Sequence, residues 1–395
     1  MMRKLYDMAT ATEKTLCRTL VLSAALMAGC ISGNGTGDTT DANVEAENIA
    51  KTLTSWLEPY QARSEVAMMQ DGGTTYLYGS FGALQSVFST FQMTFAVDAE
   101  EREVVCYGYL PTMVPEDRRR EMVEFIFRGE WEYGISTASM VLEDDGHVRC
   151  QAWTPFESFA LQPQETQWRL LGAVVDKLWS FSEGVAAVSV GCDPAEAAAN
   201  IYRTNAFEGR GEASEQKDDV AADTQAILGR CFDEDADIIV EEADDPWICT
   251  LSGKDGDVKV GIINARFEEV VRDVGGRYDV LPYSLVVRDG MVWNICNVPE
   301  VCPDKILNET ASILMGMNQQ FKYGLFGIDF DTGKIWCHYE LPVSVIPDIN
   351  ERPPKNLYCA YIKTIPIQIV AQNSEALHSE MVKAFLEVER YEEQE

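Results

Sequence analysis

Alternating apolar and polar residues, interrupted by short acidic turns, run along most of this chain and predict antiparallel strands between amphipathic helices. A first helix is expected at about 44–58. A second is expected directly after Pro115, because a proline at a first helical turn loses no hydrogen bond. A hairpin at about 135–153 and one long apolar helix or a kinked pair follow. Strands are predicted near residues 65–70, 74–79, 91–97 and 103–109.

The same order of elements recurs when the chain is compared with itself. At one constant offset, Phe95-Ala96-Val97 meets Leu285-Val286-Val287, and Cys106 meets Cys296. After the proline-opened helix the offset is slightly shorter, and Cys150 meets Cys337. Pro303 opens the corresponding helix of the second copy. A helix at 219–232, a hairpin at 325–341 and strands near 237–242, 247–252, 258–265, 278–287 and 291–298 are expected there.

The repeat predicts the fold class and the domain organisation. We expect an α+β protein with two tandem copies of an antiparallel sheet flanked by helices, in the order helix, strands, helix, β-hairpin, helix. The first copy is placed at 44–203, a linker at 204–218 and the second copy at 219–395.

Acidic, glycine-bearing turns such as "EDDG" at 143, "KDGD" at 254 and "DTG" at 331 have two interpretations, calcium loops or hairpin turns. Gly and Asp suit hairpin turns, because these need positive φ and a side chain that bonds its own backbone. The stretch "DFDTG" at 329 is too short for a calcium loop. Asp233, Asp235 and Asp237 have the spacing of calcium ligands, but Ile238 stands where that loop needs glycine. Hairpin turns are therefore favoured and no metal site is expected.

The N-terminus has the order of a secretory signal. Basic residues precede an apolar stretch from Leu20 to Ala28 that is too short to cross a bilayer, and Gly29 and Cys30 follow it. The sequence "LMAGC" resembles a prokaryotic lipoprotein signal, although Met27 stands where that motif usually has Leu. The resemblance implies a signal at 1–30 with a lipid on Cys30, and the small polar residues 31–43 predict a flexible tether. The alternative is a cytoplasmic protein with a chance cysteine.

The net charge of the chain limits the classes of partner that it can bind. The chain has 32 basic and 64 acidic residues, a net charge of −32, and would repel nucleic acid and anionic lipid headgroups. The acidity is spread along the chain and suits either solubility or a cationic partner. A protein or peptide partner is therefore compatible with the composition, nucleic acid is not, and membrane association would come through the lipid.

Cysteines and histidines offer little chemistry. No C-x-x-C pair occurs, and no His lies at zinc-ligand spacing from two cysteines. Cys106 with Cys150, and Cys296 with Cys337, would each form a disulfide if their strands are neighbours; buried free thiols are the other interpretation. His147, His338 and His378 have no nucleophile motif near them, and no phosphate-binding glycine loop is present. We expect no catalytic residues and no cofactor.

The stretch "NQQFKYGLFGIDFDTGKIWCHYEL" at 318–341 and, more loosely, "EWEYGISTASMVLEDDGHVRCQAW" at 130–153 resemble the YbjN-like family, which is related in fold to type III secretion chaperones. Asn318 fits the family's asparagine before the helix end, with Arg128 at the matching place in the first copy. The resemblance implies tandem domains, and either a monomer with an internal pseudo-dimer or a homodimer.

A lipid-anchored, non-enzymatic binding or chaperone-like protein of the cell envelope is therefore the leading hypothesis. Exposed apolar surface, to which Trp56, Trp168, Trp179 and residues 357–370 are candidates, would mark its partner site. The alternatives are an exported enzyme that uses two carboxylates between the copies, and a cytosolic regulator.

Overall fold

A computed structural model describes residues 39–58, 67–71, 73–82, 86–133, 138–161, 163–201, 238–242, 249–259, 280–288, 291–320 and 324–342. The chain divides into two compact units, one of residues 30–209 and the other of residues 1–29 with 210–395. We call the described parts of these units the first and the second module and treat each by itself. The predicted α+β class is confirmed. Among the described helices, none has both the length and the apolar character needed to cross a membrane.

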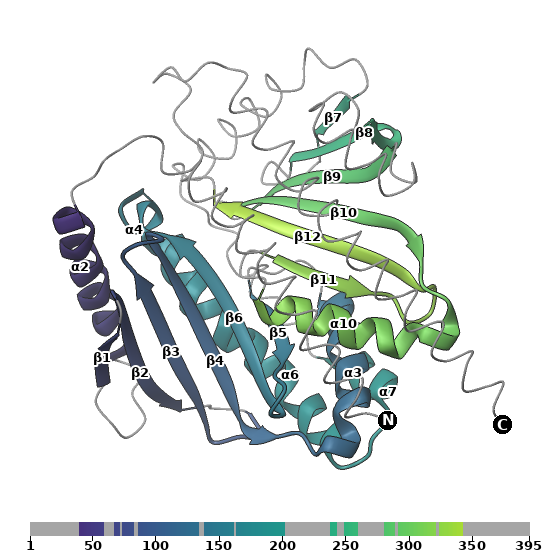
Figure 1. The fold of residues 1–395 in the computed structure, drawn as a ribbon, viewed down its shortest axis with the longest axis horizontal. Coiled ribbons are helices and arrows are strands. Elements are labelled where there is room, and N and C mark those ends of the chain that lie inside the picture. Colours follow the sequence, from purple (N-terminus) through teal and green to yellow (C-terminus); the bar gives the residue numbers. More distant parts are fainter. Residues whose placement is uncertain are drawn as a thin grey trace. The chain divides into compact units, whose positions relative to one another are not determined.

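The first module is a six-stranded antiparallel sheet in the order β1-β2-β3-β4-β6-β5 (Figure 1). Four predicted strands are present, each within a few residues of its expected bounds, and the predicted hairpin supplies the other two. The strands are β1 (Ala67–Asp71), β2 (Thr74–Gly82), β3 (Thr90–Asp98), β4 (Glu103–Met113), β5 (Ser139–Leu142) and β6 (His147–Pro155).

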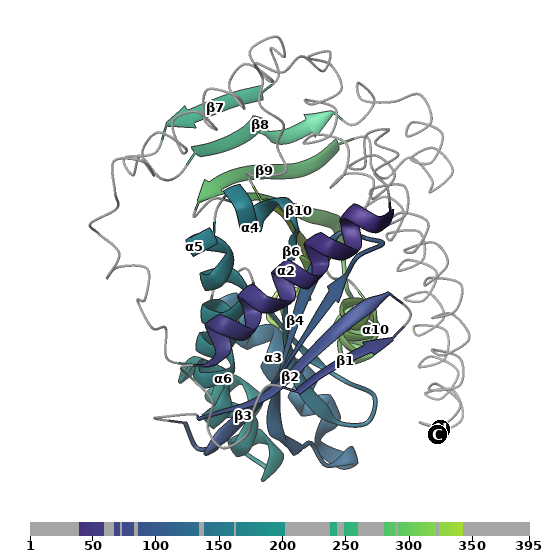
Figure 2. The same cartoon turned by 90° about the vertical axis from the view of Figure 1, so that its left-hand side faces the viewer.

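Helices cover one face of this sheet. The long helix α2 (Thr39–Leu57) packs on β2 and β3 and runs obliquely across them (Figure 2), while α6 (Ala173–Ser189) packs on β4, β5 and β6. A side chain at Gly108 of β4 would meet Leu178 at 2.6 Å, so only glycine lets α6 approach the sheet this closely. The other helices are α3 (Arg119–Tyr133), α4 (Glu157–Leu161), α5 (Pro163–Gln167) and α7 (Pro194–Ala199).

The predicted long apolar helix is an interrupted one. A π-helical turn, η3 (Trp168–Gly172), joins α5 to α6. The ring of Trp168 lies over Gly172, where a Cβ atom would be 2.2 Å from it. The helical stretch from Pro163 to Ser189 thus contains a π-helical turn in place of regular α-helix at its interruption.

The second module repeats this sheet, with the equivalent order β7-β8-β9-β10-β12-β11. Its proline-opened helix is α10 (Leu307–Gln320), which contacts β11. In both modules a short 3-10 turn, η2 (Glu116–Arg118) or η6 (Asp304–Ile306), separates the proline from the α-helix. The strands are β7 (Ile238–Glu242), β8 (Cys249–Lys259), β9 (Val280–Arg288), β10 (Met291–Val301), β11 (Gly324–Ile328) and β12 (Lys334–Pro342).

The strand register corrects part of the sequence self-comparison. Both modules have a register shift at the same place, between Tyr109 and Met113 and between Asn297 and Val301. Tyr109 therefore corresponds to Asn297, and the separation between matched positions is two residues smaller after this connection than before it. The reason is that four residues connect β3 to β4, whereas two connect β9 to β10. Cys296 therefore corresponds to Gly108, and the expected match of Cys106 with Cys296 is wrong by two positions.

One predicted turn is also absent. The "KDGD" stretch at 254 lies inside the single long strand β8, where the pairing with β9 shifts register between Ser252 and Asp257. Glycine and aspartate in this stretch mark a bulge, which these residues favour as readily as a turn. Two predicted strands, near 247–252 and 258–265, are thus replaced by one at 249–259.

The hairpin turn is locked to the strand before the helix in the same way in both modules. The N–H of Val114 donates to the carbonyl of Gly146 at 2.8 Å, and the N–H of Cys302 donates to that of Gly333 at 2.8 Å. Both glycines have positive φ, 96° and 69°. A Cβ atom at Gly146 would lie 2.8 Å from the carbonyl oxygen of Val114, and one at Gly333 would lie 2.4 Å from that of Cys302. Two independent constraints therefore require glycine at each position.

We expect Gly333→Ala to lower the free energy of unfolding of the full chain by about 1–3 kcal/mol, because alanine is strained at this φ and meets a backbone oxygen. Gly316→Ala in α10 is the matched control in the same module, since nothing lies within 4 Å of its Cβ position. That change should stabilise by about 0.5–1 kcal/mol. Urea unfolding measures both, and equal effects of the two substitutions would contradict the argument.

Candidate functional site

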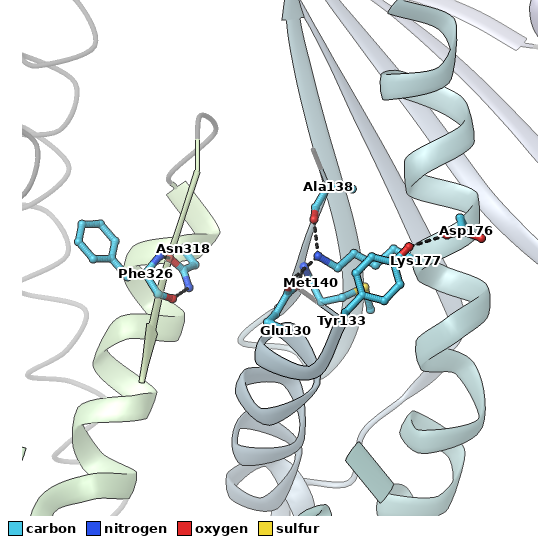
Figure 3. A network of polar contacts seen from close by, with 8 residues as sticks. All are labelled: Glu130, Tyr133, Ala138, Met140, Asp176, Lys177, Asn318 and Phe326. Carbon is cyan, nitrogen blue, oxygen red and sulfur yellow. Dashed lines mark hydrogen bonds and ion pairs between the residues drawn. The ribbon is translucent and has the colours of Figure 1, made fainter. Parts of the chain in front are cut away.

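A fully buried ion pair links α3, α6 and the hairpin of the first module. Lys177 of α6 donates to a carboxylate oxygen of Glu130 at 2.5 Å and also to the carbonyl of Ala138 (Figure 3). The other oxygen of Glu130 accepts the backbone N–H of Met140 at 2.6 Å. Glu130 is 3% exposed and Lys177 is 0% exposed. These two side chains thus satisfy buried backbone groups at the start of β5.

A second polar contact lies beside this pair. The hydroxyl of Tyr133 donates to Asp176 at 2.5 Å, and the ammonium of Lys177 lies 5.1 Å from the centre of the Tyr133 ring (Figure 3). Burial, and then the neighbouring Asp176 carboxylate, raise the pKa of Tyr133 well above its ordinary value. The phenol therefore stays protonated and acts as a hydrogen-bond donor. We call these four residues (Glu130, Tyr133, Asp176 and Lys177) the α3–α6 network.

Burial also raises the pKa of Glu130, against the opposing effects of Lys177 and of the Met140 N–H. Cys150 of β6 is buried nearby, and burial raises the pKa of its thiol as well. Glu130, Lys177 and Cys150 are thus held away from water. General acid–base chemistry needs a group that reaches a substrate, and Glu130 and Lys177 instead bond each other and the backbone.

In the second module one neutral side chain bonds the backbone of the corresponding strand. Asn318, at the end of α10, accepts the N–H of Phe326 at 2.8 Å through its side-chain oxygen and donates to the carbonyl of Phe326 at 2.7 Å (Figure 3). The register shifts of β4 and β10 show which positions of the two modules correspond. By that match Glu130, not Arg128, is the first-module counterpart of Asn318. Arg128 instead lies on the helix surface and pairs with Glu124 at 2.8 Å. The predicted match with Arg128 is therefore wrong.

The hairpin turn of the first module gathers Glu143, Asp145 and His147, whose potential metal-binding atoms lie within 4.8 Å of one another. These groups already have partners. Asp145 accepts the N–H of His147 at 3.0 Å, and Glu143 pairs with Arg149 at 3.0 Å. The turn bonds lower the pKa of Asp145. The arrangement closes a turn, as the hairpin interpretation of the acidic stretches predicts.

The acidic turn at 329 is built similarly. The carboxylate of Asp329 accepts the N–H of Asp331 at 2.9 Å and the hydroxyl of Thr332 at 2.5 Å. It caps its own turn, which is the usual role of aspartate before a glycine.

The open edge of the first sheet carries exposed apolar side chains. Among the described strands, only β2 pairs with β1. All five residues of β1 are exposed, and Met68 and Met69 are 59% and 51% exposed. Met68 is directly opposite Leu77, which is directly opposite Phe95, so the buried apolar face of the sheet continues outward to Met68. The opposite edge differs, because β5 and, in the second module, β11 are buried along their whole length.

The sequence-predicted cysteines lie on neighbouring strands, as expected. Cys106, Cys150 and Cys337 are buried free thiols in the structure. Cys150 is directly opposite Gly108, two positions from Cys106, whereas Cys296 is directly opposite Cys337. The disulfides stay predictions. Cys30, His378, Asp233, Asp235, Asp237 and residues 357–370 lie outside the described part of the chain.

The tryptophans named as candidate surface are half-buried. Trp56 of α2 stacks on Phe159 of α4 at 5.5 Å, and Trp168 and Trp179 are likewise only partly exposed. The α3–α6 network and the exposed edge strand were not predicted from the sequence. A usable signal existed for the network, because Asp176 and Lys177 are the only charged residues in the apolar run from Leu170 to Phe181.

We expect Glu130→Gln and Lys177→Met each to destabilise the first module by about 3–5 kcal/mol, because each leaves a buried partner without its counterpart. The double variant should cost much less than the sum, since a neutral amide performs this task in the second module. Hydrogen exchange of the β5 amides in the full chain, across a urea series, measures the four free energies. Additive effects would contradict the proposed coupling.

The pH dependence of stability distinguishes the loss of the ion pair from a simple loss of packing. In Lys177→Met the carboxyl of Glu130 keeps its burial but loses the lysine that opposed it, so its folded pKa rises further above the unfolded value. A raised carboxyl pKa stabilises below the unfolded pKa, and that contribution is lost as pH rises through the folded pKa. Lys177→Met should therefore be more stable near pH 4–5 than near pH 7 relative to the wild type. The double variant should show no such trend.

Comparisons with known proteins do not assign this chain to a family. No protein-family profile matches it, and no curated protein matches it. A solved structure that does match is the di-domain ARO/CYC StfQ from the steffimycin biosynthetic pathway, with 11% sequence identity over 87% of this chain and 96% of that one. The TM-score is 0.15, so the likeness carries no argument about fold or function.

Proposed function

We propose that this protein is a non-enzymatic, chaperone-like binding protein that holds extended segments of other polypeptides at the open edge of its first sheet. The observation that carries this proposal is β1, which is exposed along its whole length and bears two exposed methionines. An unpaired strand edge binds an extended chain through backbone hydrogen bonds, which are independent of the bound sequence. Methionine side chains are flexible and polarisable, so they suit varied partners.

The composition of β1 supports binding rather than protection. Proteins usually block an exposed strand edge with lysine, proline, a bulge or a covering element. The sequence of β1, Ala-Met-Met-Gln-Asp, contains neither lysine nor proline, and its pairing with β2 is regular from Ala67 to Asp71. None of the described strands occupies this edge, and we propose that it is available to a strand of another polypeptide.

Charge favours a basic partner over a second copy of the chain. Each copy carries a net charge of −32, so two copies repel each other as they approach, whereas a lysine- or arginine-rich segment is attracted. We therefore propose a cationic, extended polypeptide as the partner. The predicted lipid on Cys30 would hold this binding edge at the outer side of the cytoplasmic membrane or in the periplasm.

The enzymatic alternative has less support. Glu130 and Asp176 are buried carboxylates in different surroundings, a pattern that acid–base catalysts share. Both have structural partners, however, and Asn318 occupies the place of Glu130 in the second module. An amide cannot exchange a proton as a carboxyl does. The position therefore serves backbone satisfaction in at least one of the two copies.

We expect the full chain to suppress aggregation of reduced, unfolded lysozyme, a basic polypeptide, and the variant Met68→Lys/Met69→Lys to do so with about tenfold to hundredfold weaker affinity. Burying a methionine contributes about 1.5–3 kcal/mol, and both residues are about half exposed. Light scattering against protein concentration measures the effect.

Val44→Lys/Val190→Lys is the charge-matched control, because these valines are 54% and 85% exposed and lie on α2 and after α6. Equal loss in both double variants would show a charge effect instead of an edge site. No suppression by the wild-type chain would overturn the proposed function.

The anchor has its own test. We expect the intact mass of protein purified from its native membranes to lack residues 1–29 and to include diacylglycerol on Cys30. A mass that corresponds to an unmodified start at Met1 or Met8 would contradict export and favour the cytoplasmic alternative.

A further inference from the structure

Two neighbouring strands carry cysteines in each module, but the register differs between the modules. In the first, Cys106 of β4 is directly opposite Ala152, and Cys150 of β6 is directly opposite Gly108. The two thiols are thus diagonal neighbours, whose Cα atoms are typically about 7–8 Å apart. A disulfide needs a Cα separation of about 4.4–6.8 Å. The backbone would have to move for this pair to join.

In the second module the equivalent strands place Cys296 of β10 directly opposite Cys337 of β12. Directly opposite residues of an antiparallel pair are on the same face of the sheet, with Cα atoms about 4.5–5.5 Å apart. That separation is inside the range that a disulfide needs. The regular pairing continues on both sides, from Met291 to Asn297, so the two positions are fixed by the ladder.

We propose that Cys296 and Cys337 form a cross-strand disulfide when the protein meets an oxidant, and that Cys106 and Cys150 stay thiols. The oxidant is a low-molecular-weight disulfide such as oxidised glutathione. One cysteine thiolate attacks it, which displaces a glutathione thiolate and forms a mixed disulfide. The second cysteine thiolate then attacks the protein sulfur of that bond and displaces the other glutathione. The two protons lost by the cysteines appear on the two glutathione thiols, so two thiols and one disulfide give one disulfide and two thiols.

Helix α6 of the first module excludes a cysteine from the position that Cys296 occupies in the second. The position of Cys296 corresponds to Gly108, where α6 approaches so closely that Val174 and Leu178 would lie 2.7 and 2.6 Å from a Cβ atom. The first module has no room for a cysteine there. Cys106 lies instead two positions away, diagonal to Cys150, so the register and not burial distinguishes the two modules.

The disulfide would close a loop of the chain that contains α10 and β11 of the second module. The segment between Cys296 and Cys337 includes Pro303, α10, Asn318 and β11. Closing this loop restricts the unfolded chain and ties β10 to β12 at the centre of the sheet. The oxidised protein should therefore resist unfolding better than the reduced protein, and the gain should be confined to the second module.

The full chain, after incubation with oxidised glutathione, is blocked with N-ethylmaleimide, digested without reduction and analysed by mass spectrometry. We expect a linked pair of peptides that contain Cys296 and Cys337, and a higher midpoint of urea unfolding that reduction reverses. Both should persist in Cys106→Ser/Cys150→Ser, the matched control, and disappear in Cys296→Ser.

Cys337 is buried, so slow access of the oxidant must be separated from an unsuitable site. In a second arm the reduced, unfolded chain is refolded in a buffer of reduced and oxidised glutathione, in which access is not limiting. Absence of the Cys296–Cys337 link in both arms would overturn the proposal, as would an equal yield of a Cys106–Cys150 link.

Discussion

The buried first strand of the hairpin imposes the constraint on which each module depends. β5 and β11 are buried along their whole length at one edge of their sheets. A backbone N–H or carbonyl on the outer side of such a strand has no water and no further strand to bond, and leaving it unpaired costs about 1–3 kcal/mol. The end of the preceding helix supplies the missing partner, through Glu130 in one module and Asn318 in the other.

The two solutions have different consequences for the rest of the module. An asparagine donates and accepts, so Asn318 satisfies both backbone groups of Phe326 by itself. A carboxylate only accepts, so Glu130 needs a donor for the neighbouring carbonyl and a counter-charge for itself. Lys177 provides both, and this requirement brings α6 onto the hairpin. The ionic solution thus joins α3, α6 and the hairpin, and the amide joins α10 to β11.

Patterns of period and turn residues in the sequence were sufficient for the α+β class, the repeat, most described strands and the proline-opened helices. They were insufficient for register. A difference of two residues in one hairpin connection shifts the matches that keep the original offset, so Cys106 was paired with Cys296 and Arg128 with Asn318. The match of Cys150 with Cys337, which used a shorter offset, agrees with the register. The bulge in β8 was mistaken for a turn for a related reason, because glycine and aspartate serve both. The exposure of the β1 side chains depends on which strands α2 packs against, and these are β2 and β3. A local sequence pattern does not show which strands a helix will cover.

The open edge raises the question of why such a chain would not pair with itself. β1 contains neither lysine nor proline, but repulsion between molecules does not need to be local. A net charge of −32 acts at the range of the screening length, about 8 Å at physiological salt, and opposes the approach of a second copy before any strand contact forms. The same field attracts a basic chain. A high net charge can therefore keep an edge strand selective without lysine or proline in the strand, whereas added salt should weaken both the selectivity and the protection together.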